Sequence, residues 1–163
     1  MRTIKCKKLN PVDCLGLISF HDMINCCGYK IGESPIEFFR DLLCCNIGDS
    51  GYTAFSIVKC KKREMIIDEI EQHICTAEVL IPLDGDVVIF AGPATDGIIP
   101  PEFKAFIVPQ YTMVIFDFGV WHKAPFPIKN EIVNSIVVLP PLTYSRDCNV
   151  LSLEQEQKCR IIV

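Results

Sequence analysis

The sequence lacks the patterns on which cysteine-based zinc sites and most nucleic-acid sites depend. It contains three histidines and one tryptophan in 163 residues, and its ten cysteines include no Cys-X-X-Cys pair. Without such a pair, a structural zinc site built on cysteines is not expected. The net charge of −4 lacks the basic excess that nucleic-acid binding requires, so no nucleic-acid partner is predicted.

Long apolar runs are also missing. No run reaches the roughly 18 residues that a membrane span needs, and the early run CLGLISF is short and lacks an export cleavage site. We therefore expect no membrane partner and a cytoplasmic protein. Its cysteines, including the adjacent pairs Cys26–Cys27 and Cys44–Cys45, are interpreted as reduced thiols that serve as small core residues. A disulfide-rich secreted fold is the alternative.

The length and composition are those of one globular domain. Half of the residues are hydrophobic and 22% are charged, which suits a chain with a single buried core. We expect one domain over residues 1–163, with an N-terminal extension over about 1–50, a barrel over about 51–145 and a C-terminal tail over 146–163.

Two short helices are predicted in the N-terminal part. Asn10–Pro11 has the form of an N-cap followed by proline at the first helical position, and Ser34–Pro35 repeats this signal. The apolar residues after the second signal have the spacing of a buried helical stripe: Ile36, Phe38, Phe39, Leu42 and Leu43.

From residue 52 to 140 the sequence consists of short runs rich in Val, Ile and Phe. Asp84–Gly85 between two such runs indicates a hairpin, and Gly92–Pro101 indicates a loop. Seven or more strands with almost no helix predict an all-β sandwich or barrel. The runs are YTAFSIVKC, EMIIDEIEQHI, AEVLIPL, DVVIFAG, FKAFIVP, YTMVIFDFG and IVNSIVVLP.

The stretch EIEQHICTAEVLIPLDG, residues 69–85, gathers several chemically active side chains. Glu69, Glu71 and His73 alternate, so in a strand they project to one side. Glu78 opens the next apolar run, and His122 lies further along in FGVWHKAPF. Carboxylate oxygens and imidazole nitrogens suit Mn, Fe, Zn or Ni in a mixed site. Taken alone, however, such an acidic run is more often a solvated strand face, and a lone histidine is usually a packed residue.

The spacing of these residues matches the two cupin motifs. His73, four residues, Glu78, six residues and Gly85 form the second half of the first motif, G(X)5HXH(X)3-4E(X)6G, with Glu71 at the position of its first histidine. The segment 119–122, GVWH, matches the GxxH of the second motif, although an aspartate replaces its proline at position 117. The chain thus resembles a cupin, which implies a double-stranded β-helix barrel.

Four segments narrow the resemblance to the bacterial ureidoglycolate lyase family: EIEQH…IPLDG, FKAFIVP, GVWHKAPF and the tail DCNVLSLEQEQ. The resemblance runs from about Phe55 to Gln157. It implies a cytoplasmic homodimeric cupin of allantoin degradation that splits ureidoglycolate into glyoxylate and urea. Lys123 stands where family members commonly carry a second histidine, and Leu139–Pro141 replaces a strand end that is usually acidic and basic. In a regular strand, Lys123 would face away from the side chain of His122.

The resemblance implies a role for each residue of the constellation. It implies a divalent metal, Zn, Mn, Ni or Fe, and no organic cofactor; the ligands would be Glu71, His73, Glu78 and His122. The residues that would act on a small hydroxy-acid or sugar-like substrate are Glu69, Glu71, His73 and His122, with Glu69 as a spare carboxylate for proton transfer. Two alternatives stay open: a metal-dependent sugar isomerase or epimerase, and a cupin that binds a small ligand without turnover.

Overall fold

The computed structural model describes residues 1–25, 29–48 and 51–163, and most of these residues lie in short strands. The elements in chain order are β1 (Arg2–Lys8), α1 (Pro11–Cys14), β2 (Ile18–Asp22), β3 (Lys30–Ile31), β4 (Phe38–Phe39), β5 (Ala54–Lys61), β6 (Ile66–Ile67), β7 (Glu69–Gln72), β8 (Glu78–Pro82), β9 (Val87–Ala91), β10 (Lys104–Val108), β11 (Thr112–Phe116), β12 (Phe126–Pro127), β13 (Ile132–Leu139), α2 (Thr143–Arg146), β14 (Asn149–Ser152) and β15 (Cys159–Ile162).

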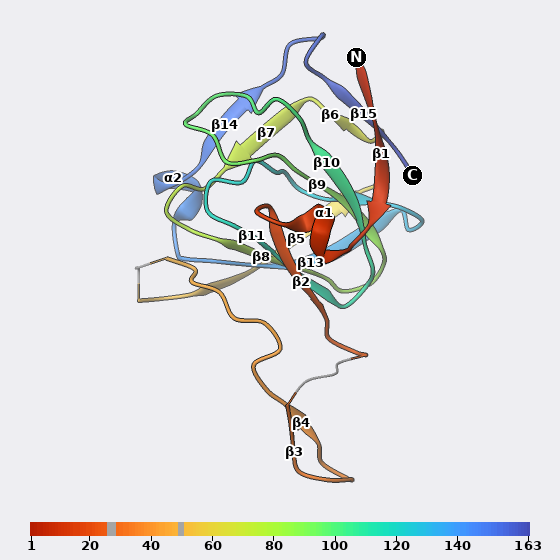
Figure 1. Ribbon diagram of the computed structural model, residues 1–163, viewed down its shortest axis with the longest axis vertical. Coiled ribbons are helices and arrows are strands. Elements are labelled where there is room, and N and C mark those ends of the chain that lie inside the picture. The colour runs from red at the N-terminus through yellow and green to blue at the C-terminus, as the bar shows by residue number, and fades with distance from the viewer. Residues whose placement is uncertain (26–28, 49–50) are drawn as a thin grey trace.

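Two curled sheets form the barrel (Figure 1). One has the strand order β12-β9-β10-β1-β15-β6 and the other the order β2-β11-β8-β13-β5. Most pairs are antiparallel, but β1 runs parallel to both β10 and β15. A smaller pair, β14 with β7, closes one end of the barrel, where α2 also lies. The predicted all-β cupin barrel is confirmed.

The core follows from the alternation of side chains along each strand. In β8, Leu80 points into the space between the two sheets, whereas Val79 points to the outer face of the five-stranded sheet. In β9, Val87 and Ile89 face the same interior as Leu80, and Phe90 packs on the opposite side of its own sheet. Glu78 shares its face of β8 with Leu80, so its carboxylate is directed inward. The strand period thereby carries one acid into an apolar barrel.

The hairpin predicted at Asp84–Gly85 is wrong. β8 pairs with β11 and β13, whereas β9 pairs with β10 and β12, so the strands on either side of this turn belong to different sheets. The turn carries the chain across the barrel from one sheet to the other. The Asp84 carboxylate accepts hydrogen bonds from the backbone and side-chain nitrogens of Asn134, which fixes the crossing against β13.

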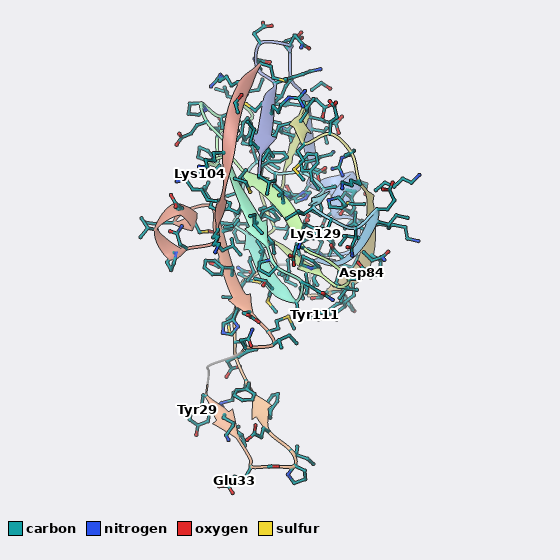
Figure 2. All side chains as sticks on the ribbon, turned by 90° about the vertical axis from the view of Figure 1, so that its right-hand side faces the viewer. Tyr29, Glu33, Asp84, Lys104, Tyr111 and Lys129 are labelled. Carbon is teal, nitrogen blue, oxygen red and sulfur yellow. The ribbon has the colours of Figure 1, made fainter. Side chains whose placement is uncertain are left out.

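The helix predicted after Ser34–Pro35 is also wrong, whereas the one predicted after Asn10–Pro11 is confirmed as α1. Residues 29–44, here termed the arm, extend away from the barrel, and β3 and β4 pair within it (Figures 1 and 2). A helical stripe requires an apolar surface to cover it, and the described residues leave Ile36 and Phe38 of the arm 77% and 60% exposed. Leu43, near its end, packs on the barrel.

The described cysteines carry no disulfide. Cys14, Cys60 and Cys159 are buried, and burial raises the pKa of each thiol, which suits small neutral core residues. Cys44 and Cys45, by contrast, are exposed, and Cys26–Cys27 lies outside the described residues. Within the part of the chain that the structure describes, no helix has the length and apolar character needed to cross a membrane.

Candidate metal and substrate site

The site is assembled where β7 meets the segment that carries His122. The backbone N–H of Glu71 donates to the carbonyl of His122 at 2.8 Å, and the N–H of His122 donates back to Glu71 at 2.9 Å. Glu78 lies opposite Phe116 in the β8–β11 ladder, and the ring of Phe116 stacks on His122 with 4.4 Å between centroids. Residues distant in the sequence are therefore fixed together by backbone pairing and one aromatic contact.

A glycine allows the chain to reach this position. Gly119 has φ of +71° and donates its N–H to the carbonyl of His73 at 2.6 Å. Residues other than glycine rarely adopt this backbone conformation. The turn therefore explains why glycine stands at this position of the GxxH motif: Gly119 turns the chain so that His122, three residues later, returns beside His73.

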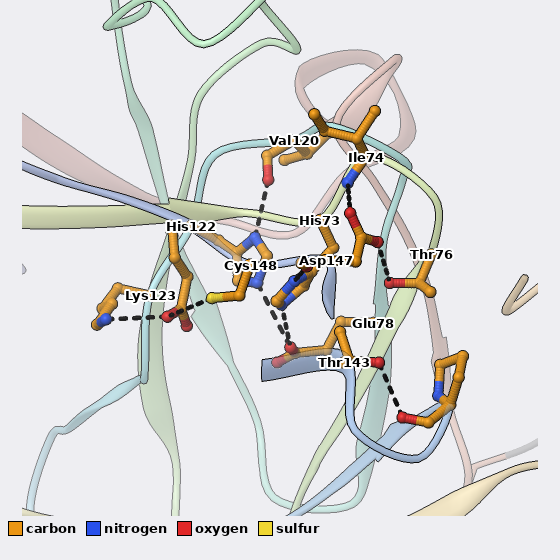
Figure 3. Close-up of polar contacts among 12 residues, drawn as sticks. His73, Ile74, Thr76, Glu78, Val120, His122, Lys123, Thr143, Asp147 and Cys148 are labelled. Carbon is orange, nitrogen blue, oxygen red and sulfur yellow. Dashed lines mark hydrogen bonds and ion pairs between the residues drawn. The ribbon is translucent and has the colours of Figure 1, made fainter. Parts of the chain in front are cut away.

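Four predicted ligand side chains converge in this region, and Figure 3 labels three of them, His73, Glu78 and His122. The Glu78 Oε2 atom lies 3.3 Å from His73 Nε2 and 3.5 Å from His122 Nε2. One ligand atom from each of Glu71, His73 and His122 falls within 4.8 Å of the others. The imidazoles of His73 and His122 are 1% and 2% exposed, so their ring nitrogens are shielded from water.

The hydrogen bonds of the two histidines identify the proton on each ring. His73 Nδ1 lies 2.5 Å from the carbonyl oxygen of Asp147, and His122 Nδ1 lies 2.8 Å from that of Val120. A carbonyl only accepts, so each Nδ1 carries the hydrogen. In the neutral ring, each Nε2 then presents a lone pair.

With both rings neutral, three acceptors consequently face one another, and none of the residues that the structure describes donates to them. His73 Nε2, His122 Nε2 and Glu78 Oε2 are buried, and their mutual directions make no hydrogen bond. Unpaired buried acceptors are costly, and a cation among them removes the cost. Imidazole nitrogens with the other nitrogen bound to a carbonyl, plus carboxylates, are the ligand set of divalent transition metals. The residues present therefore fit the metal that the sequence predicts.

The electrostatics also favour positive charge at this point. Burial by itself would raise the pKa of the Glu78 carboxyl, but the neighbouring imidazoles of His122 and His73 lower it to about 2. Burial would lower the pKa of His73, whereas its contacts with Glu78 and the Asp147 carbonyl raise it, and the net change is a raised pKa. Glu78 is thus held as a carboxylate, and a proton or a metal ion balances it.

Lys123 lies on the same side as the acids, which the sequence allows only where the chain bends out of a regular strand. Its Nζ atom is 2.7 Å from Glu69 Oε1 and 2.9 Å from Glu71 Oε2. His122 sits in an isolated bridge and Lys123 follows it in irregular chain, so no regular strand sets the direction of Lys123. Burial would lower the pKa of Lys123, yet hydrogen bonds with Glu69 and Glu71 raise it, so the amine remains charged.

Residues of the C-terminal segment complete the wall of the site, and the motif spacing did not identify them. The ring of Tyr144 meets His73 edge-on with 6.1 Å between centroids, and Cys148 Sγ lies 3.9 Å from Glu71 Oε2. Asp147 contacts His73 through its carbonyl. The one available signal was the tail sequence DCNV, which the family resemblance singled out without a role.

The structure thus brings together the predicted residues in two layers. The inner layer is the cluster of Glu71, His73, Glu78 and His122, and the outer layer is Glu69, which reaches the cluster through Lys123. Their catalytic and metal-binding roles stay predictions. The arrangement offers a buried cation position beside a carboxylate and an ammonium group that are partly open to solvent.

The solved structures that resemble this chain share little sequence identity with it. One similar structure is that of an oxalate decarboxylase, from work on its substrate binding mode and a reaction specificity switch. It has 18% identity and a TM-score of 0.45, over 66% of this chain and 27% of that chain. RmlC from Streptococcus suis in complex with dTDP-D-xylose has 12% identity and a TM-score of 0.44, over 94% of this chain and 75% of that one. This chain therefore spans about a quarter of the oxalate decarboxylase. Comparison with curated proteins gives no match.

The match that decides the family is one of sequence pattern. The model of the family described as ureidoglycolate lyase matches residues 37–160. This range includes β7, β8, the segment with His122 and the tail with Asp147, and so contains every residue of the site described above. With this match over most of its length, the chain belongs to the ureidoglycolate lyase family.

Proposed function

We propose that this protein cleaves ureidoglycolate to glyoxylate and urea. The observation that carries the proposal is the buried convergence of His73 Nε2, His122 Nε2 and Glu78 Oε2, three acceptors that require a cation, in a member of the ureidoglycolate lyase family. A cytoplasmic location remains the prediction from the sequence.

The reaction needs three things from the protein. Ureidoglycolate is a carbinolamine: its hydroxyl loses a proton as the C=O bond of glyoxylate forms, the C–N bond breaks, and the departing urea nitrogen takes up a proton. The site must therefore accept one proton, return one, and hold the substrate carboxylate. No other atoms or electrons enter the balance.

A metal ion held by the cluster would supply part of the first requirement. Glu71, His73, Glu78 and His122 would hold a divalent ion, which lowers the pKa of a hydroxyl bound to it. Glu69 would move the proton; its side chain is partly exposed, and Lys123 links it to Glu71 of the cluster, which supports this role. An ammonium group has three donors. Two of those of Lys123 serve Glu69 and Glu71, and the third is left for the substrate carboxylate.

The direct test is turnover by the purified protein. We expect release of glyoxylate and urea in equal amounts from ureidoglycolate, its loss after chelation, and its recovery when Zn²⁺ or Mn²⁺ is returned. Metal-loaded protein without turnover would contradict the lyase. Epimerisation of a nucleotide sugar by that protein would then support the isomerase alternative, and ligand binding without any turnover would support the non-catalytic one. Turnover that survives complete metal removal would retain the lyase and leave the carboxylates as acid and base.

We also propose that the protein is a homodimer. β5 is an edge strand whose outer face presents Phe55 and Ile57, which are 77% and 61% exposed. The arm exposes Ile36 and Phe38, and a two-stranded hairpin is marginally stable alone in water. Exposed apolar strands and edges of this kind are usually covered in the native assembly.

Light scattering checks the assembly. At micromolar concentration we expect twice the chain mass of 18.4 kDa, with an interface of at least about 1,000 Å². Replacing Phe55 and Ile57 by serine is expected to shift the protein toward monomer, because it removes apolar area from the interface. The matched control replaces Val12 of α1 and Leu15, the residue after α1, which are 84% and 83% exposed, and should remain dimeric. A monomeric wild-type protein would contradict the proposal.

A further inference from the structure

Asp147 makes more contacts to the loop after β7 than any role in capping α2 requires. Its Oδ1 atom accepts the backbone N–H of Ile74 at 2.8 Å. Its Oδ2 atom accepts the N–H of Cys75 at 2.8 Å. The same atom accepts the hydroxyl of Thr76 at 3.2 Å (Figure 3). One carboxylate thus holds three consecutive residues that lie between two members of the cluster, His73 and Glu78.

The backbone of the same residue acts on the cluster itself. The carbonyl oxygen of Asp147 accepts the Nδ1–H of His73 at 2.5 Å. This bond sets which nitrogen of the ring carries the proton, and so leaves Nε2 free to face Glu78. The backbone carbonyl of Asp147 therefore binds the imidazole of His73, and its carboxylate binds the residues that follow His73.

Asp147 is itself held in place from its own side. Its N–H donates to the carbonyl of Thr143 at 2.8 Å, and the Thr143 hydroxyl donates to Pro140 at 2.8 Å. Tyr144 and Cys148, on either side, contact His73 and Glu71. The segment 143–148 is therefore a wall anchored to the end of β13, and the carbonyl of Asp147 is a fixed point of that wall.

We propose that Asp147 is a positioning residue: its carboxylate clamps residues 74–76 so that its carbonyl fixes the tautomer and orientation of His73 in the metal cluster. The proposal rests on the metal site of the proposed function but not on the identity of the substrate. Partners that orient a ligating histidine typically contribute 10-fold to 100-fold to metal affinity.

The test compares Asp147→Ala and Asp147→Asn with a matched control. The carboxylate of Asp22, at the end of β2, also accepts three hydrogen bonds in a turn, from Ile24 and twice from Asn25. Asp22→Ala thus removes an equivalent clamp remote from the cluster. The asparagine variant keeps the size of the side chain and one acceptor oxygen, so it reports even where the alanine variant does not fold.

Two measurements on ¹⁵N-histidine-labelled protein decide the question. In metal-free wild-type protein, at alkaline pH where imidazoles are neutral, ¹H–¹⁵N ring correlations are expected to show His73 with its proton on Nδ1. Both Asp147 variants should populate the Nε2–H form and bind Zn²⁺ about 10-fold to 100-fold more weakly, whereas Asp22→Ala should match the wild type in both measurements.

An unchanged His73 tautomer in the Asp147 variants, or Zn²⁺ affinity equal to that of the wild type, would overturn the proposal. A weakening equal to that of Asp22→Ala would also overturn it, since it would reflect general loss of stability. Failure of the wild-type protein to cleave ureidoglycolate would overturn the proposed function alone, because neither the ring correlations nor the Zn²⁺ titration involves the substrate.

Discussion

Replacing His122 by alanine is expected to remove the bound metal and ureidoglycolate cleavage together, while the barrel remains folded. The imidazole supplies one of the buried lone pairs of the cluster, and its loss opens the coordination shell to water. We expect metal content to fall from about one ion per chain to near zero, and activity to fall at least about 100-fold. His73→Ala should have the same effect, because its Nε2 atom faces the same carboxylate.

Folding should survive because the apolar strands of the core provide the stability. The variant loses the hydrogen bond from His122 Nδ1 to Val120, worth about 1 kcal/mol, and the stacking on Phe116. Elemental analysis, urea and glyoxylate release, and thermal unfolding measure the three outcomes. The chain's third histidine provides the control: His21, on β2, lies outside the cluster. Its alanine variant should keep metal and activity. Full activity in His122→Ala would reject the site assignment.

The convergence of the cluster could be predicted because two rules act at once. Strand alternation places Glu69 and Glu71 on one side of β7, and both indeed reach Lys123. The motif spacing then relates His73 to Glu78 across the turn between β7 and β8. Each rule depends on local sequence. The strand-rich composition predicted a sandwich or a barrel, and the resemblance to the cupin motifs implied the barrel topology that joins the two rules. The pairing of Glu71 with His122 then depends on the barrel closing as a cupin does.

Features decided by tertiary contact could not be predicted in this way. The signal at Ser34–Pro35 is that of a helix start, yet the described residues leave Ile36 and Phe38 of the arm exposed. Asp84–Gly85 has the residues of a hairpin, but the partners of β8 and β9 lie in different sheets. A turn signal specifies that the chain bends and does not specify which strands pair afterwards.

Asp147 and Lys123 show the same limit at the site itself. Asp147 is 74 residues from His73 in sequence, and only the docking of the segment 143–148 brings its carbonyl to the ring. Lys123 turns toward the acids because a single bridge pair, and not a regular strand, holds His122, and the sequence alone did not show that the chain bends there. Sequence periodicity predicts the direction of side chains only within regular strands. The contacts that Lys123 and Asp147 make with this cluster come from irregular chain.

The last prediction concerns Glu69, the carboxylate that we propose for proton transfer and not for metal binding. Glu69→Gln is expected to lower kcat about 10²-fold to 10⁴-fold, the usual contribution of a general acid or base, and to leave metal content unchanged. The amide has the same shape but neither accepts nor returns a proton. Stability should change little, because the side chain is 45% exposed and its pair with Lys123 is of the partly solvated kind.

Two further variants separate proton transfer from the ion pair itself. Lys123→Met breaks the pair but leaves the Glu69 carboxylate in place, so we expect it to act chiefly on KM, through the lost contact with the substrate carboxylate. Glu37→Gln breaks an equivalent Lys30–Glu37 pair on the arm, with the glutamate side chain 41% exposed, and should leave both constants unchanged. Steady-state kinetics with metal analysis of each protein distinguishes these outcomes. Wild-type kcat in Glu69→Gln would remove Glu69 from the chemistry, and the proton would then have to pass through Glu71, the other carboxylate that Lys123 binds.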